Sequence, residues 1–311
     1  MLVDVAINYY GKPYHTMVTI GSLLEHSGCH IGTVYLIKEA KQPDGADVIT
    51  ELLRRHDWDV EVFTPRYYFG WQMHPDWIGR AYGRLTGKSG AFAMRRKQYR
   101  WSVRYQYALE HTDKRYLFLT HNDVLFTGDA LQPMLDLMNT GEHAGVGDIG
   151  ACWKCPASAA SLCADHQFSR LTLNYREAVE LYERFPSTHR HPNLSRLDAS
   201  NPVPFPECRL NEWFALLDVA AYLREAKPAG DTEPLGSFAL GDTGIAWFRS
   251  MVHKGYSFAH ATGPYEHVWT SRRGGGGHEA LFDTSLYENE EAVAERYYLQ
   301  HYAEQARDPR S

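Results

Sequence analysis

The sequence has neither long hydrophobic runs nor an excess of basic charge. No stretch approaches the roughly 18 apolar residues that a membrane-spanning helix needs. Residues 1–8 have no basic region ahead of their apolar side chains, so they predict a strand and not a signal peptide. The net charge of −6 also lacks the basic surplus that is typical of nucleic-acid-binding proteins. We therefore expect a cytoplasmic protein with no membrane span and no nucleic-acid partner; peripheral contact with the inner membrane face stays open.

Cysteine is scarce, and several common catalytic motifs are absent. Five cysteines, an odd number in a chain without an export signal, argue against a disulfide framework. No Gly-x-Ser-x-Gly, Walker loop or His-Glu-x-x-His sequence occurs, which removes the commonest hydrolase and nucleoside-triphosphatase interpretations. With 311 residues, no internal repeat and no sharp change of composition, we expect one domain over residues 1–311.

Strand and helix patterns alternate along the first part of the chain. Short apolar or β-branched runs predict strands at residues 2–8, 31–37, 58–63 and 115–120. Apolar residues at helical spacing predict helices at residues 13–26, 46–56 and 95–111. This alternation predicts an α/β fold with a mainly parallel, Rossmann-like sheet flanked by helices. Such sheets bind ligands beyond the carboxyl ends of their strands, here near residues 8–11 and 121–123.

The strongest polar signal is the triplet His121, Asn122 and Asp123, which directly follows a buried strand. A carboxylate and an imidazole two residues apart can share a divalent cation. The carboxylate suits Mg²⁺ or Mn²⁺, and the imidazole favours Mn²⁺. The alternative is a polar turn in which Asn122 and Asp123 cap the loop.

At this position the sequence resembles the GT-A glycosyltransferases. In that family a strand ends in an Asp-x-Asp motif, which binds Mn²⁺ or Mg²⁺ on the diphosphate of a nucleotide sugar. Asp123 matches the last acid of the motif, whereas His121 replaces the first. The resemblance implies that Asn122 and Asp123 contact the donor; the departure at His121 leaves a metal-independent enzyme open.

Two further segments carry the resemblance. Residues 240–258 are similar to the Glu-Asp-x-x-Leu helix start and following Gly-Tyr strand of inverting family members. This implies that Asp242 takes the proton from the acceptor hydroxyl, a role that suits a carboxylate; the alternative is a helix N-cap. His267 lies where the family places a histidine that completes the metal site with His121 and Asp123. Residues 272–277 resemble the mobile loop that closes over the diphosphate, or form a flexible linker.

The resemblance also implies residues for the donor and the acceptor. On the donor side it points to Asn8, Tyr9, Tyr10, Arg100 and Arg104, where tyrosines follow the first strand and arginines precede the fourth. For the arginines the alternative is a solvated helix face. On the acceptor side it points to Asn211, Glu212 and Trp213.

Two motifs compete with this interpretation. Residues 145–150 match the dinucleotide fingerprint Gly-x-Gly-x-x-Gly, but no helix pattern follows them, so we expect a tight strand or loop and no NAD. Four cysteines could bind a structural Zn²⁺: Cys152, Cys155, Cys163 and Cys208. The alternative is that they are ordinary buried cysteines.

These observations lead to one hypothesis and one rival. The chain is predicted to be a hexosyltransferase-type glycosyltransferase, with a nucleotide-binding half (1–126), an acceptor and metal half (127–275) and a tail with a helix (276–311). It would move a sugar from a UDP- or GDP-linked donor to a saccharide or other hydroxyl acceptor, with inversion and with Mn²⁺ or Mg²⁺. The rival is a non-catalytic relative that binds carbohydrate or nucleotide.

Overall fold

The structure is a computed structural model. It describes residues 2–40, 42–66, 94–163, 166, 168–185, 193–237, 240, 242–271 and 283–303. The predicted loop at residues 272–277 lies outside the described residues. No described helix is both long enough and apolar enough to cross a lipid bilayer.

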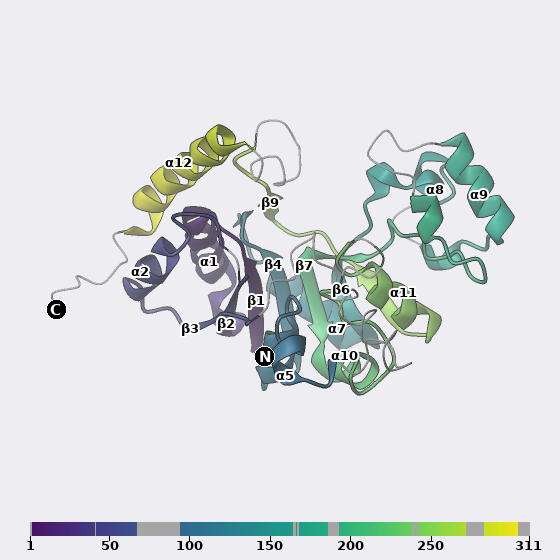
Figure 1. The fold of residues 1–311 in the computed structure, drawn as a ribbon, viewed down its shortest axis with the longest axis horizontal. Coiled ribbons are helices and arrows are strands. Elements are labelled where there is room, and N and C mark those ends of the chain that lie inside the picture. Colours follow the sequence, from purple (N-terminus) through teal and green to yellow (C-terminus); the bar gives the residue numbers. More distant parts are fainter. Residues whose placement is uncertain are drawn as a thin grey trace.

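A seven-stranded sheet forms the centre of the described fold (Figure 1). Its strands, in spatial order, are β3 (Val60–Phe63), β2 (Ile31–Lys38), β1 (Val3–Tyr9), β4 (Tyr116–His121), β7 (Leu210–Asp218), β6 (His143–Ile149) and β8 (Ser257–His260). Only β7 runs against its neighbours, and the other pairings are parallel. This confirms the predicted α/β fold with a mainly parallel sheet. A separate antiparallel pair joins β5 (Val124–Phe126) to β9 (Tyr265–His267).

Helices lie on both faces of the sheet. The longer ones are α1 (Pro13–Ser27), α7 (Leu131–Thr140), α9 (Tyr175–Arg184), α11 (Ile245–His253) and α12 (Thr284–His301). The shorter ones are α2 (Val48–Arg54), α5 (Lys97–Arg100), α6 (Gln106–His111), α8 (Pro156–Ala159) and α10 (Val219–Glu225). In Figure 1, α12 lies near α1 and α2 on one side of the molecule, whereas α8 and α9 form a lobe on the other side.

Strand alternation divides the core into two layers. Because successive side chains of a strand point to opposite faces, Val5 and Ile7 of β1 pack with Phe118 in one cluster. Ala6 packs with Leu119 in the cluster on the other face. The first cluster includes residues of α1, α2, α7 and α12. The second includes residues of α6, α10 and α11, so the sheet is buried on both sides.

The helix predicted at residues 95–111 is instead two short helices, α5 and α6. Tyr105 adopts a left-handed conformation with φ of 63°, which interrupts a right-handed helix. Its neighbour Arg104 forms an isolated antiparallel bridge with Gly236, far away in the sequence. This long-range pairing overrides the local helical pattern.

Most of the Gly-x-Gly-x-x-Gly segment lies in strand β6, as predicted, and it is followed first by a single 3₁₀ turn at Cys152–Lys154 and not by the long helix of a dinucleotide site. Its glycines serve close packing: a Cβ atom on Gly147 would lie 2.1 Å from the carbonyl oxygen of Phe214 on β7. The small residue therefore lets β6 approach β7, and no phosphate is needed to explain it.

Candidate functional site

The site lies at the edge where the parallel strands end. In the register of β1 with β4, Asn8 is opposite His121 at the carboxyl end of both strands. In the β5–β9 pair, Val124 is opposite His267, so the residue after Asp123 lies beside the second histidine. Because β7 is reversed, its first residues, including Glu212, reach the same edge. The topology thus gathers side chains from distant parts of the chain.

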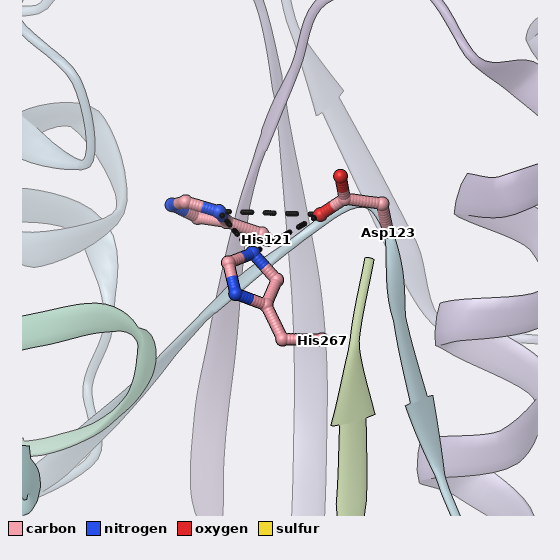
Figure 2. Close-up of side chains that lie close together, drawn as sticks. All are labelled: His121, Asp123 and His267. Carbon is pink, nitrogen blue, oxygen red and sulfur yellow. Dashed lines mark hydrogen bonds and ion pairs between the residues drawn. The ribbon is translucent and has the colours of Figure 1, made fainter. Parts of the chain in front are cut away.

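His121, Asp123 and His267 form a compact triangle (Figure 2). The His121 Nδ1 atom lies 3.2 Å from Nε2 of His267 and 4.0 Å from Oδ1 of Asp123. Oδ1 of Asp123 is 3.5 Å from the same Nε2 atom. Within the described residues, this is the one group in which three potential metal-ligand atoms come together. The structure therefore brings together the three residues predicted to hold a metal.

The triangle has the dimensions and the electrostatics of a cation site. Ligand atoms about 2.1 Å from one ion lie about 3.0 Å apart when the bonds are at right angles, close to the spacings observed here. Oδ1 of Asp123 is buried and has no hydrogen-bond partner within the described residues. Burial raises the pKa of this carboxyl, but contact with His267 and the nearby Lys12 and His121 outweigh burial and hold it well below its usual range. The carboxylate is therefore ionised, with one oxygen available to a cation.

Glu212 and Trp213, predicted to face the acceptor, lie against the two histidines. Oε1 of Glu212 is 3.5 Å from Nε2 of His121, and its Oε2 atom is buried with no partner in the described part of the chain. Burial raises the pKa of Glu212, but contact with His121 and the charge of Arg209 lower it to about 2. The Trp213 ring stacks on His267, with 4.8 Å between ring centroids.

Two residues beside Trp213 were not predicted from the sequence. The indole Nε1 of Trp213 donates to Oδ2 of Asp148, 3.0 Å away, and the Tyr265 hydroxyl lies 3.3 Å from the same oxygen. Asp148 lies within the Gly-x-Gly-x-x-Gly segment, which we interpreted only through its glycines. Asp148 is the one acidic residue of that segment, which was the signal available.

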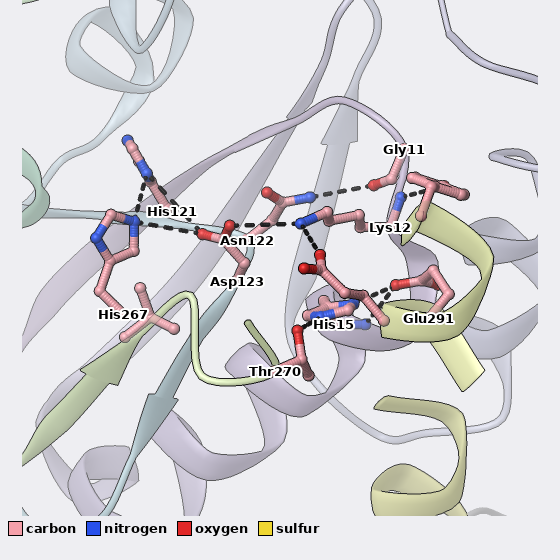
Figure 3. Close-up of polar contacts among 12 residues, drawn as sticks. Gly11, Lys12, His15, His121, Asn122, Asp123, His267, Thr270 and Glu291 are labelled. Carbon is pink, nitrogen blue, oxygen red and sulfur yellow. Dashed lines mark hydrogen bonds and ion pairs between the residues drawn. The ribbon is translucent and has the colours of Figure 1, made fainter. Parts of the chain in front are cut away.

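Lys12 is a third residue that sequence reasoning missed (Figure 3). Its side chain is 5% exposed, and its Nζ atom lies 3.7 Å from Oδ2 of Asp123 and 3.1 Å from Oε2 of Glu290. Lys12 follows β1 directly and precedes α1, at a position where the sequence shows no motif. Its partner Glu290 is on the last helix of the described chain, so no local pattern indicates the contact.

Two of the predicted donor residues share a small pocket at the ends of β1 and β2. Glu39 accepts hydrogen bonds from Nδ2 of Asn8 at 3.0 Å and from Nη2 of Arg104 at 2.6 Å. Lys38, Pro65 and Ser102 also line this pocket. Glu39 was not predicted, although it follows a strand of the sheet in the same way as the metal triplet.

The other predicted donor residues lie elsewhere. Tyr9 is fully buried, and its hydroxyl donates to the carbonyl of Ala46, so its side chain belongs to the core and presents no face to a nucleobase. Arg100 is buried and pairs with Glu110. Tyr10 is half-buried after the end of β1.

Asn122 fixes the loop that follows β1. Its Nδ2 atom donates to the carbonyl of Gly11 at 3.1 Å and lies 3.3 Å from Oγ1 of Thr16 (Figure 3). Its amide therefore supports the neighbouring loop. This contact is compatible in part with the alternative of a polar turn, because Asn122 supports a loop, whereas His121 and Asp123 belong to the triangle.

Asp242 lies before α11 and pairs with Arg209, with 2.5 Å between Oδ2 and Nη1. It is not the N-cap of α11; that position is taken by Gly244, whose φ is 82°. Its side chain is 45% exposed. Asn211 is fully buried, where its Oδ1 accepts from Nε of the same arginine and its amide donates to the carbonyl of Gly150. Arg209 thus links the predicted base to the start of β7.

The four cysteines predicted as a zinc site do not form a ligand group. All four are described and carry free thiols, yet they are absent from the one three-ligand cluster of the described residues. Cys155 and Cys208 are both buried in the second core cluster. Burial raises the pKa of Cys152 to about 11, which disfavours the thiolate that zinc requires. The structure gives the zinc prediction no support. Cys155 and Cys208 fit the alternative of buried cysteines, whereas Cys152 and Cys163 are half-buried.

No protein-family model matches the sequence, and no curated protein matches it. Solved structures show remote similarity. A mannosyltransferase from Pyrobaculum calidifontis in complex with GDP-Man and Mn²⁺ is 12% identical, with a TM-score of 0.45 over 88% of this chain and 58% of that one. Core-mannan synthase A from Aspergillus fumigatus, in its Mn/GDP form, is 10% identical, with a TM-score of 0.44 over 86% and 75%. TarS 1-349 from S. aureus is 11% identical, with a TM-score of 0.32 over 48% and 36%.

The chain thus spans 36% of the length of the S. aureus protein and 58% of the Pyrobaculum enzyme.

Proposed function

We propose that this chain is a metal-dependent glycosyltransferase that uses a nucleotide-diphosphate sugar. The observation that carries the proposal is the triangle of His121, Asp123 and His267 beyond the carboxyl ends of a parallel sheet. Such edges bind nucleotides in α/β proteins. Two imidazoles and one carboxylate suit Mn²⁺ and leave coordination positions for phosphate oxygens. A cation held there would neutralise the charge that develops on the leaving diphosphate.

The pocket of Asn8, Glu39 and Arg104 supports a nucleoside position next to the metal residues. Asn8 is opposite His121 in the sheet, so this pocket and the triangle occupy neighbouring strand ends. Glu39 can accept hydrogen bonds from ribose hydroxyls or base N–H groups, while Arg104 supplies a cation near the phosphates. We propose that the donor spans these two places, in the nucleotide-binding half predicted for residues 1–126.

The acceptor would lie on the opposite side, near the start of β7. The Trp213 ring and the Asp148 carboxylate offer the stacking surface and the hydrogen-bond acceptor that a saccharide needs. Two carboxylates are candidates for the base that deprotonates the attacking hydroxyl. We propose Asp242, because its side chain is 45% exposed, whereas that of Glu212 is 6% exposed and buried against His121. If the deprotonated hydroxyl forms its bond to the anomeric carbon on the face opposite the diphosphate while the bond to the diphosphate breaks, this single displacement inverts that carbon.

The three metal-ligand side chains of the triangle also fit a different kind of enzyme. Two histidines and one carboxylate hold Fe²⁺ in non-haem oxygenases. The polar pocket at a neighbouring strand end favours the glycosyltransferase proposal, because a nucleotide-sugar enzyme needs a nucleotide site and an oxygenase does not. Comparing Mn²⁺ with Fe²⁺ distinguishes the two candidate functions. For a glycosyltransferase, a nucleotide with Mn²⁺ should raise the Tm of the chain in the absence of oxygen, whereas an oxygenase reaction with Fe²⁺ requires oxygen.

The first test is thermal unfolding of the full chain with UDP, GDP or CMP, each with Mn²⁺ and with a chelator. We expect one nucleotide to raise Tm only when Mn²⁺ is present, and Asp123→Asn to abolish that shift. His301→Ala, an exposed histidine on α12, is the matched control and should leave the shift intact. A chain that no nucleotide stabilises would contradict the proposed donor site.

The second test separates catalysis from binding. Asp242→Asn should lower turnover of the nucleotide sugar by about 10²-fold or more while the affinity for the nucleotide stays unchanged. Glu212→Gln is measured in parallel, and a larger loss there would move the role of base to Glu212. A wild-type chain that binds the nucleotide but releases no sugar in the presence of varied acceptors would support the non-catalytic rival.

A further inference from the structure

The loop between β1 and α1 has an unusual backbone. Gly11 and Lys12 both adopt left-handed conformations, with φ of 63° and 55°. For a lysine this conformation is uncommon and must be imposed by its surroundings. Three contacts impose it: the Lys12 N–H donates to the Tyr287 hydroxyl at 2.8 Å, the Gly11 N–H donates to Gln42 at 2.8 Å, and Asn122 donates to the Gly11 carbonyl at 3.1 Å. The loop is therefore built to place the Lys12 side chain.

The Lys12 ammonium is buried between two carboxylates (Figure 3). Glu290 of α12, whose side chain is 6% exposed, lies 3.1 Å away, and Asp123 lies 3.7 Å away. A buried ammonium requires a nearby anion, and Glu290 is the closer of the two. The position of Lys12 is thus determined by a residue of the C-terminal helix.

The two oxygens of Asp123 face different partners. Oδ2 faces Lys12, whereas Oδ1 faces the two histidines and has no hydrogen-bond partner within the described residues. An ammonium at Oδ2 orients the carboxylate so that Oδ1 points into the triangle. The same ammonium also repels a cation bound at Oδ1. Its net effect depends on how much of its charge Glu290 compensates.

We propose that Glu290 sets the metal affinity of the site by holding the Lys12 ammonium away from Asp123. The inference rests on the proposed function, because it assumes that the triangle binds a divalent cation. Without the Glu290 charge, Asp123 becomes the nearest anion to Lys12, and the ammonium competes with the metal for that carboxylate. Glu290 and Lys12 are positioning residues: they contact a metal ligand, not the metal, and such outer contacts tune affinity.

The position of α12 does not depend on Glu290 alone. Glu291 accepts the backbone N–H of Tyr14 at 3.0 Å and that of His15 at 3.3 Å, and Tyr287 accepts that of Lys12. These contacts hold α12 against α1 when Glu290 is neutralised. A variant at Glu290 therefore changes the charge beside Lys12 while the helix stays in place.

The test is Mn²⁺ binding to the full chain, measured by titration calorimetry and by the electron paramagnetic resonance signal of free Mn²⁺. Glu290→Gln should raise the Kd for Mn²⁺ about tenfold. The double variant Lys12→Met with Glu290→Gln removes both charges and should bring the Kd back toward the wild-type value. Glu288→Gln, on the exposed face of the same helix, is the matched control and should leave it unchanged.

The outcomes separate this inference from the proposed function. If the wild-type chain binds no Mn²⁺, the proposed metal site fails and the inference fails with it. If the wild-type chain binds Mn²⁺ and Glu290→Gln binds it equally well, the inference alone is overturned. Equal weakening in the single and the double variants would also overturn it, because the effect would then not pass through the Lys12 charge. Should Glu290→Gln not fold, Glu290→Asp keeps the charge at a greater distance and should raise the Kd in the same direction.

Discussion

The carboxylate of Glu291 accepts a hydrogen bond from the backbone N–H of Tyr14, 3.0 Å away, so a residue of the last described helix caps the first one. Lys12, the N-cap residue of α1, provides no side-chain cap of its own. The N-terminus of a helix attracts anions through its unpaired N–H groups. In this protein a carboxylate already occupies that position, so we do not expect α1 to bind the diphosphate of the proposed donor.

Removing this cap should destabilise the fold. We expect Glu291→Ala to lower the free energy of unfolding by about 1–2 kcal/mol or more, because two N–H groups of α1 lose their acceptor and the buried His15 imidazole loses its partner. Urea denaturation followed by circular dichroism measures the change. Glu288→Ala, at an exposed position of the same helix, controls for helix propensity. Equal stability of the two variants would show that Glu291 does not act as a cap.

Arg104 and Arg100 should behave differently, although both were predicted to contact the donor. Arg104 lines the pocket with Asn8 and Glu39, and we expect Arg104→Met to weaken nucleotide binding about tenfold, as the loss of one charge-assisted contact does. Arg100→Met should leave nucleotide binding unchanged but cost about 1.5–3 kcal/mol of stability, because the partly buried Glu110 carboxylate loses its charged donor and keeps only Gln106 and Trp101. Calorimetric titration and denaturation measure the two effects; the reverse pattern would restore Arg100 as a donor residue.

The Arg100–Glu110 pair should make the fold sensitive to acid. Burial raises the pKa of Glu110, but hydrogen bonds from Arg100, Gln106 and Trp101 outweigh burial and lower it below the ordinary value. A carboxyl with a depressed pKa stabilises the folded chain fully above the ordinary glutamate pKa, and this contribution disappears as the pH falls through the depressed value. We expect Glu110→Gln to be less stable at neutral pH and to show a shallower loss of stability in acid. Unfolding free energies across that range test this, with the exposed Glu142→Gln as control.

Replacing Gly147 with a larger residue should destabilise the fold, because its Cβ position is filled by the neighbouring strand. The added Cβ of Gly147→Ala would lie 2.1 Å from a backbone oxygen of β7, and overpacking of this kind typically costs about 1–3 kcal/mol. Gly28→Ala is the control, since its Cβ would lie 4.0 Å from its nearest neighbour. Thermal unfolding compares the two variants. Stabilisation of the wild-type chain by NAD would contradict the interpretation of these glycines as packing residues.

Local patterns in the sequence predicted much of this fold. The apolar runs predicted β1, β2 and β4, because a parallel strand buried on both faces leaves a continuous hydrophobic signal. The same patterns predicted α1 and placed the metal triplet at the end of β4. These signals act over a few residues, so they can be read without the tertiary structure.

The sequence analysis failed where contacts between residues far apart in the chain determine the local structure. The bridge between Arg104 and Gly236 breaks the predicted helix, and the contact of Lys12 with Glu290 joins opposite ends of the chain. Tyr9 was a different case, because its burial could have been predicted. It shares the strand face of Val5 and Ile7, so strict alternation assigns it to the core.

The lobe of α8 and α9 (Figure 1) shares the second core cluster with α11, and the Phe168 ring lies 5.3 Å from that of Phe248, measured between centroids. The Gly150 N–H donates to the Arg209 carbonyl at 2.8 Å, and the Ala151 N–H donates to the Glu207 carbonyl at 2.8 Å, so the chain leaves β6 and returns to β7 at one point. Any replacement for this segment must keep its apolar contacts with α11 as well as its two ends, because losing them would leave a cavity in the core.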